Sequence, residues 1–114
     1  LLIMKLVYLS HPFSGGNEAA NRGRAERISA RLSVERPDMV ILNPLRCFED
    51  YRFSYEEILE KCFALLARCD EIWMCYGWES SAGCTREFRF AQNCGICVRF
   101  LGPEYARTGE GMES

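Results

Sequence analysis

Short, almost wholly apolar segments alternate with longer helical patterns along this 114-residue chain. The strand-like segments lie at residues 2–9, 39–42, 71–76 and 96–101. Helical periodicity fills the intervals between them, at residues 18–34, 54–69 and 84–93. Strands that are apolar on both faces are typical of parallel sheets covered by helices, and the intervening helices provide the right-handed crossovers that such sheets need. The alternation predicts an α/β fold with a parallel sheet of four to five strands.

Local signals support the helices. Asn17 can cap the first one, whose Ala20, Ile28 and Leu32 are expected to face inward. Ser54 and Glu57 stand at capping-box spacing at the start of the second. Residues 45–53 are expected to form a polar-aromatic connection without regular structure. One domain of this length can bury a real core.

Charge and cysteine content restrict the classes of partner. Fourteen basic side chains against sixteen acidic ones give a net charge of −2, which argues against binding a nucleic-acid polymer. No apolar run reaches the ~20 residues that span a bilayer, and Leu1-Leu2-Ile3 lacks the basic leader of a secretory signal. Seven cysteines, an odd number partly inside apolar segments, indicate a reducing compartment. We therefore expect a cytoplasmic protein.

The segment from Ile72 to Glu87 is the first candidate site. An apolar strand runs into a turn of small residues and then into a helix that carries Glu87. In open α/β sheets, ligands bind beyond the carboxyl ends of the strands, beside helix N-termini that attract anions. Ser81 and Gly83 can cradle such an anion while Glu87 faces the same cleft. An ordinary solvated surface carboxylate is the alternative for Glu87.

A second loop, from Ser10 to Gly16, also joins a strand to a helix and includes His11 and Gly15. In a parallel sheet its strand can neighbour the one that ends near Tyr76, so both loops border one cleft. His11 suggests a ligand contact, although an imidazole that only orders the turn explains it equally well. Tyr8, Phe13, Tyr76 and Trp78 can stack on a base or sugar, or serve in packing.

Neither redox nor metal chemistry has a clear pattern here. Cys94 and Cys97 have redox spacing, but they join a helix to a strand instead of opening a helix, so no helix N-terminus lowers a thiol pKa. One histidine and scattered cysteines form no pair of metal-ligand motifs. We expect no cofactor and no metal.

Two blocks, residues 7–16 and residues 69–87 together with Ala91 and Gly95, resemble the nucleoside 2-deoxyribosyltransferase-like superfamily. The resemblance is closer to its small uncharacterised bacterial and phage branch, and it spans residues 4–101. It implies a three-layer, Rossmann/flavodoxin-like sheet with helices on both faces. It also implies a single such domain at residues 1–102, followed by a C-terminal tail at 103–114. Small proteins of this superfamily commonly form dimers, so the resemblance is compatible with a homo-oligomer.

The resemblance also implies roles for individual residues. The Glu that matches Glu87 is the nucleophile that attacks the anomeric carbon and forms a glycosyl-enzyme intermediate. Tyr8 and the Ser10 to Gly16 loop then frame base and sugar, while Ser81 and Gly83 contact the 5′ hydroxyl or phosphate. The predicted substrate-binding residues are Tyr8, Ser10, His11, Gly15, Gly16, Trp78, Glu79, Ser81 and Gly83.

Cys62 departs from the family pattern. The related enzymes carry an Asp at this place, eight residues before Asp70, and a thiol cannot replace a carboxylic acid in protonating a leaving base. Glu79 or Asp50 are alternative proton sources. The leading hypothesis is an N-glycosidase or 2-deoxyribosyltransferase-like enzyme that acts on a nucleoside or nucleotide. The alternative hypothesis is a non-catalytic module that binds a nucleotide-derived ligand in a degenerate site. The third hypothesis is a thiol-dependent protein that uses Cys94 and Cys97.

Overall fold

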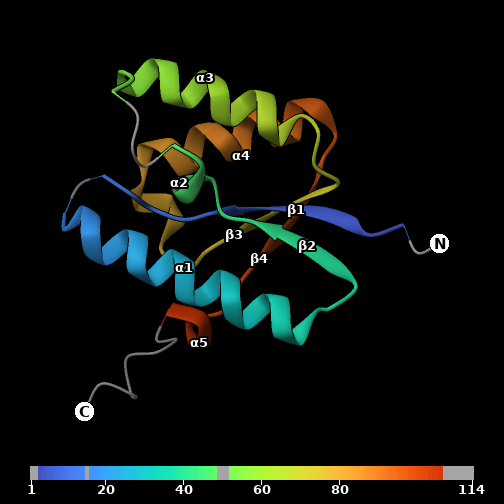
Figure 1. Ribbon diagram of the computed structural model, residues 1–114. Coiled ribbons are helices and arrows are strands. Elements are labelled where there is room, and N and C mark those ends of the chain that lie inside the picture. Colours follow the sequence, from blue (N-terminus) through green and yellow to red (C-terminus); the bar gives the residue numbers. More distant parts are fainter. Residues whose placement is uncertain (1–2, 15, 49–51, 107–114) are drawn as a thin grey trace, which may run out of the picture.

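Four parallel strands form one sheet in the order β2-β1-β3-β4 in the computed structural model, which describes residues 3–14, 16–48 and 52–106 (Figure 1). The strands are β1 (Lys5–Ser10), β2 (Met39–Leu42), β3 (Glu71–Met74) and β4 (Cys97–Phe100). This order is that of doubly wound sheets. Strand β2 is added on one side of β1, and β3 and β4 are added on the other side, so the strand order reverses between β1 and β3. The structure confirms the predicted α/β fold with a parallel sheet, which has four strands in the described part of the chain.

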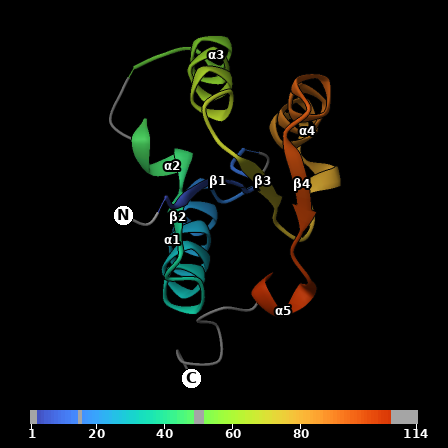
Figure 2. The ribbon, with the colours of Figure 1, turned by 90° about the vertical axis from the view of Figure 1, so that its right-hand side faces the viewer.

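Helices cover both faces of the sheet. They are α1 (Glu18–Glu35), α2 (Pro44–Cys47), α3 (Tyr55–Leu66), α4 (Ala82–Cys94) and α5 (Pro103–Ala106). Figure 2 shows α3 and α4 on one side of the strands and α1 with α5 on the other, which makes three layers. No helix in the described part of the chain is long and apolar enough to cross a membrane.

The central strand β1 supplies both halves of the core. Val7 and Leu9 pack with Ile28 and Leu32 of α1, whereas Tyr8 belongs to the cluster beneath α3 and α4. The alternation follows from the two-residue period of a strand. Burying each large apolar side chain contributes about 1.5–3 kcal/mol. Because the period continues, Ser10 lies on the same face as Tyr8, under α4.

Helix α4 presents a face to the sheet that includes a carboxylate. Cys84, Glu87 and Ala91 are buried, at the three- and four-residue spacings that share one face of a helix. The Ser81 Oγ accepts a hydrogen bond of 3.2 Å from the backbone N–H of Cys84 and so caps the N-terminus. Gly95, with φ +70°, ends the helix in the left-handed conformation that favours glycine.

Several boundaries and contacts differ from the sequence-based expectation. Strand β1 begins at Lys5, and the preceding Ile3 is 97% exposed because no neighbouring strand pairs with it. Ala20 is exposed, and Ala25 instead packs beneath α1 with Ile28 and Leu32. The expected loop at 45–53 begins with the short helix α2, which Asn43 caps. The capping box of Ser54 and Glu57 is confirmed.

The C-terminal end of the described chain packs on the side of the sheet that α1 covers. Tyr105 of α5 lies against the core cluster on the α1 side, and its hydroxyl donates a 2.7 Å hydrogen bond to Glu35. The Arg31 guanidinium stands 4.2 Å from the centre of the Tyr105 ring. The division into a domain at 1–102 and a tail at 103–114 stays a prediction.

Candidate active site

A pocket of about 340 Å³ opens at the carboxyl ends of the strands. His11 follows β1, Pro44 follows β2, and Ser81 and Gly83 follow β3, and all of them line it. This is the edge where the strand order reverses and where open α/β sheets bind ligands. Its volume lies in the range of small-molecule sites. The two loops that the sequence singled out therefore border one cavity.

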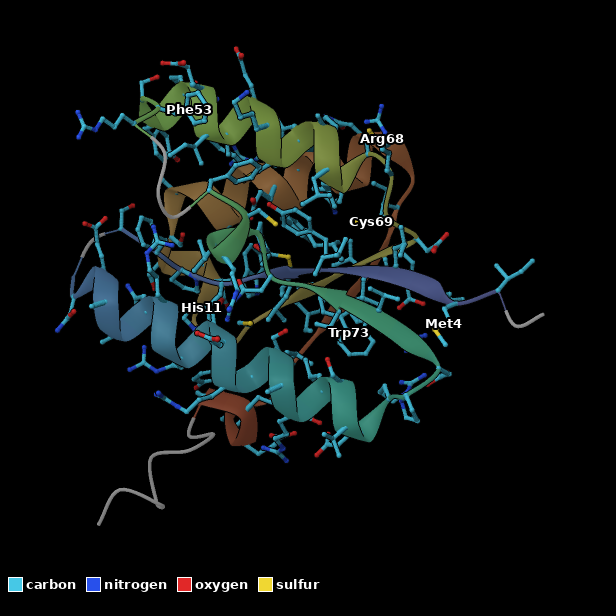
Figure 3. All side chains as sticks on the ribbon, in the orientation of Figure 1. Met4, His11, Phe53, Arg68, Cys69 and Trp73 are labelled. Atoms are coloured by element: carbon cyan, nitrogen blue, oxygen red, sulfur yellow. The ribbon has the colours of Figure 1, made fainter. Side chains whose placement is uncertain are left out.

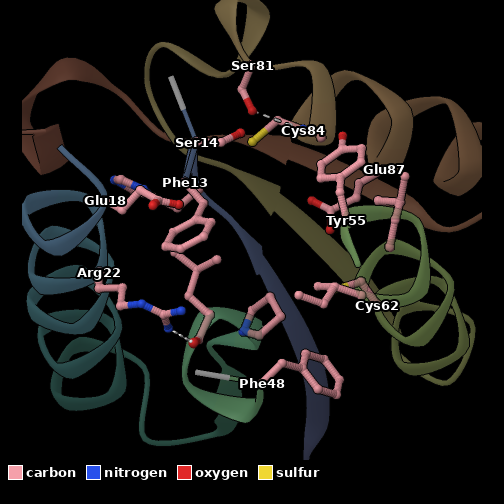
Figure 4. A pocket seen from close by; sticks show the side chains of 16 residues that line it. Phe13, Ser14, Glu18, Arg22, Phe48, Tyr55, Cys62, Ser81, Cys84 and Glu87 are labelled. Carbon is pink, nitrogen blue, oxygen red and sulfur yellow. Dashed lines mark hydrogen bonds between the residues drawn. The ribbon is translucent and has the colours of Figure 1, made fainter. Parts of the chain in front are cut away.

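Glu87 lies at the base of this pocket. Its side chain is only 7% exposed, yet it is one of the lining residues (Figure 4). The Tyr8 hydroxyl donates a hydrogen bond to Oε2 of Glu87, and the Ser10 hydroxyl donates another to Oε1 over 2.8 Å. Both donors come from β1, and neither hydroxyl is among the groups that line the cavity. The strand thus fixes the orientation of a carboxylate that faces the pocket.

Burial and hydrogen bonding act in opposite directions on the Glu87 carboxyl. Burial raises its pKa above the ordinary value, and the hydrogen bonds from Tyr8 and Ser10 oppose this rise. The pKa of Tyr8 lies well above its usual value, first because the phenol is buried and then because Glu87 and Cys62 stand beside it. Tyr8 therefore keeps its proton and remains a donor to the carboxylate.

Two thiols flank the same carboxylate. Cys62 of α3 and Cys84 of α4 are buried and line the pocket. Burial raises the pKa of Cys62 to about 11, and burial also raises that of Cys84 to about 11. Both groups are neutral thiols at physiological pH. Cys62, the position at which the sequence departs from the family pattern, thus belongs to the pocket, beside Tyr8 and Glu87.

His11 lies at the carboxyl end of β1, far along the strand from Met4 (Figure 3). The imidazole is 8% exposed, and its Nδ1 stands 2.7 Å from the carbonyl oxygen of Pro12. Burial lowers the pKa of His11, the Pro12 contact raises it, and the charge of Arg24 lowers it further. A neutral imidazole that donates from Nδ1 fits this surrounding.

Apart from Phe13 of the loop after β1, the outer walls come from segments that carried no functional signal in the sequence. Phe13, Phe48 and Tyr55 are aromatic lining residues, and Glu18 and Arg22 reach the cavity from α1. Arg22 donates to the carbonyl oxygen of Leu45, and its guanidinium stands 4.5 Å from the centre of the Phe13 ring. Sequence patterns missed most of this rim, because only the fold brings the start of α1 and the region of α2 to one cavity.

Some predicted binding residues lie away from this cavity. Gly16, Trp78 and Glu79 are not among the described residues that line it. Trp78 packs against Phe88 and Phe100, with ring centres 4.8 and 5.7 Å away, which favours the packing alternative for this residue. Glu79 is exposed on the turn η1 (Trp78–Ser80). Gly15 and Asp50 lie outside the described residues, and the binding role of every predicted site residue stays a prediction.

Within the described ranges, no group of three or more His, Cys, Asp or Glu side chains is placed to hold a metal ion. Cys94 and Cys97 are exposed free thiols on either side of the turn after α4. What the pocket offers chemically is therefore a buried, hydrogen-bonded carboxylate in an enclosure lined by aromatic rings, hydroxyls and thiols. Such a carboxylate can act as a nucleophile toward an electrophilic carbon.

Known proteins share this architecture. A solved 2-deoxyribosyltransferase from the psychrotolerant bacterium Bacillus psychrosaccharolyticus superposes with a TM-score of 0.60 at 16% sequence identity, over 86% of this chain and 72% of that one. At this identity the match demonstrates a shared fold. No curated protein matches the sequence. A family model described as "Domain of unknown function (DUF4406)" matches residues 5–100, nearly the whole described domain. The chain therefore belongs to the DUF4406 family.

Proposed function

We propose that this protein is an enzyme that breaks the N-glycosidic bond of a nucleoside or nucleotide, with Glu87 as the nucleophile. The observation that carries the proposal is the Glu87 carboxylate, buried, held by Tyr8 and Ser10, and facing a pocket at the switch point of the sheet. The fold shared with a 2-deoxyribosyltransferase supports a nucleoside-related activity.

The first chemical step follows from this arrangement. An oxygen of Glu87 bonds to the anomeric carbon while the bond from that carbon to the base nitrogen breaks. The electron pair of the broken bond stays on the base, which takes up one proton from solvent. The hydroxyls of Tyr8 and Ser10 orient the carboxylate for this attack. Release of the sugar to water gives hydrolysis, and release to a second base gives transfer.

The pocket also offers a wall for each part of such a substrate. Phe13 and Phe48 present flat apolar faces that suit a nucleobase. Ser81 and Gly83, at the N-terminus of α4, suit the 5′ hydroxyl or phosphate of the sugar. The sugar would then lie between these walls, beside Glu87.

Incubation with a panel of deoxynucleosides, ribonucleosides and their 5′-monophosphates tests the proposal, with free base measured by chromatography. We expect at least one substrate to release its base. Glu87→Gln should reduce the release by at least about 10³-fold, because the amide cannot act as nucleophile. Glu60→Gln removes an exposed carboxylate of α3 that does not line the pocket, and it should leave the rate unchanged. No turnover of any substrate would contradict an enzymatic role.

Cys62 supports a second candidate function, a non-catalytic module that binds a nucleotide-derived ligand. Its thiol lies in the pocket beside Tyr8, and burial raises its pKa to about 11, so it is a poor proton donor for a leaving base. Calorimetric binding of a nucleoside or nucleotide without base release, unaltered in Cys62→Asp, would favour this alternative. New base release in Cys62→Asp would indicate that only the acid was missing.

A further inference from the structure

A second carboxylate borders the pocket that holds Glu87. Glu18 is the first residue of α1, and its exposed side chain is one of the lining groups. Figure 4 shows Glu18 beside Phe13 on the α1 side of the cavity, with Glu87 on the α4 side. Helix α1 covers the opposite face of the sheet from α4 (Figure 2). The two carboxylates thus approach one cavity from different layers of the fold.

The proposed reaction needs a proton acceptor after the base has left. At that stage the sugar is an ester of Glu87, and water must attack the anomeric carbon from the side away from this carboxylate. Water becomes a good nucleophile when a neighbouring group takes its proton. The group must therefore line the pocket across from Glu87 and must be able to accept a proton.

The other titratable groups that line the pocket fit this role less well. Arg22 has no acceptor, and Tyr55 carries a phenol, which is a poorer proton acceptor than a carboxylate. The Cys62 and Cys84 thiols hold their protons at neutral pH, because burial raises both pKa values to about 11. His11 is neutral, but its burial and the nearby Arg24 disfavour the imidazolium that it would have to become.

We propose that Glu18 is the general base that activates water in the second step, a role that rests on the proposed function of Glu87. The water oxygen bonds to the anomeric carbon, and one of its protons passes to Glu18. The bond between that carbon and Glu87 breaks, and its electron pair returns to the Glu87 carboxylate. Because Glu18 is exposed, it can then give the proton to bulk water. Hydrolysis of the glycosyl-enzyme is completed and both carboxylates are regenerated.

Glu18→Gln separates the two steps, because it leaves Glu87 in place and removes only the acceptor. With the best substrate of the wild-type panel, we expect the variant to release a rapid first equivalent of base. Its steady-state rate should fall by about 10²-fold or more, the usual range for loss of a general base. Intact-protein mass spectrometry should show the sugar adduct accumulating on Glu87. Azide, which has no proton to lose, should restore the rate and form the glycosyl azide.

Matched variants decide between Glu18 and its competitors. Glu60 is an exposed carboxylate of α3 outside the pocket lining, so Glu60→Gln should keep the wild-type rate and should accumulate no adduct. An unchanged steady-state rate in Glu18→Gln, an equal loss of the first and later turnovers, or accumulation of the adduct in His11→Gln instead would overturn the proposal. If the wild-type protein releases no base at all, the function proposed for Glu87 fails, and the role of Glu18 falls with it. If the wild type turns over and Glu18→Gln keeps the wild-type steady-state rate, only the general-base role fails.

Discussion

Replacing Tyr8 by Phe removes one hydroxyl from beneath the pocket and keeps the shape of a fully buried ring. That hydroxyl donates to Oε2 of Glu87, and Ser10 holds the other carboxylate oxygen over 2.8 Å. Burial raises the pKa of Glu87, and the hydrogen bond from Tyr8 is the first of the two contacts that oppose the rise. Tyr8→Phe should therefore raise this pKa further.

The size of the effect follows from the kind of bond that is lost. A hydrogen bond to a charged group contributes about 1.5–3 kcal/mol. At about 1.4 kcal/mol for each factor of ten, the ionised fraction of Glu87 should fall about 10- to 100-fold at a pH well below its wild-type pKa. The ionised form of Glu87, the proposed nucleophile, would then be scarcer at low pH but not altered in kind.

Two measurements check this prediction. Carbon-13 NMR of glutamate side-chain carboxyls, with the Glu87 resonance identified by its loss in Glu87→Gln, should show this group titrating at higher pH in Tyr8→Phe. The pH profile of base release should move its acidic limb the same way and recover at high pH. Tyr105→Phe is the matched control, because its hydroxyl donates over 2.7 Å to Glu35 on the other face of the sheet. If Glu87 titrates at the same pH in the wild type and in Tyr8→Phe, the reasoning is refuted.

The same substitution has a consequence for folding. Because the pKa of Glu87 is higher in the folded chain than in the unfolded one, ionising this group destabilises the fold. The free energy of unfolding should fall as pH rises from the ordinary pKa of a glutamate through the raised one. Tyr8→Phe should extend this fall to higher pH, and urea unfolding at a series of pH values measures it.

Three further predictions concern the walls of the pocket, the far end of the sheet and the thiols. Gly83→Ala should weaken nucleoside binding in calorimetry, because the new Cβ takes space in the pocket. Thermal stability should not fall, because this Cβ stands 3.6 Å from the Tyr55 hydroxyl, which is an ordinary contact. Undiminished binding would contradict the placement of this wall. Glu71 is 2% exposed, and although burial alone raises its pKa, hydrogen bonds from Trp73, Arg99 and Lys5 outweigh it and lower the pKa to about 2. The ionised Glu71 should contribute about 1–3 kcal/mol to stability, a modest amount because Lys5 and Arg99 are largely exposed. This contribution should be present above the ordinary pKa of a glutamate and should be lost as pH falls toward 2. Urea unfolding of Glu71→Gln should show a flatter pH dependence than the wild type, and an equal dependence would refute this account. The exposed thiols are Cys47, Cys94 and Cys97. Iodoacetamide should label them before the buried thiols, as measured by mass spectrometry. Early labelling of a buried thiol would show that the core opens.

The fold followed from the sequence because its signals are local. The apolar run at 39–42 matches β2, Asn17 caps α1, and the Ser54–Glu57 box opens α3. Each of these needs only neighbouring residues to form. In the described part of 45–53, the sequence misses α2, which has four residues and follows β2 after a single residue. So short a helix shows no periodicity that a sequence pattern can reveal.

The pocket was predictable in part. The loops after β1 and β3 were expected to meet, since parallel strands bring their carboxyl ends to one edge, and both of them do line the cavity. Glu18 and Phe48 were not singled out, because they join the pocket only through the packing of α1 and the region of α2 around the sheet. The position of Trp78 after β3 suits base stacking, but β4 brings Phe100 beside it, and an aromatic cluster forms there instead.

Strand β1 ties the Glu87 carboxylate to the centre of the sheet. Tyr8 and Ser10 are fully buried in the central strand, between β2 and β3, and their hydroxyls meet Glu87 on the face of the sheet that α4 covers. In hydrogen exchange, the amides of this strand should open only with global unfolding, whereas the amides of Phe13 and Glu18, on the rim of the pocket, should exchange sooner through local opening. Substitutions on the rim should therefore change which ligand is accepted, while Glu87, the proposed nucleophile, keeps its setting.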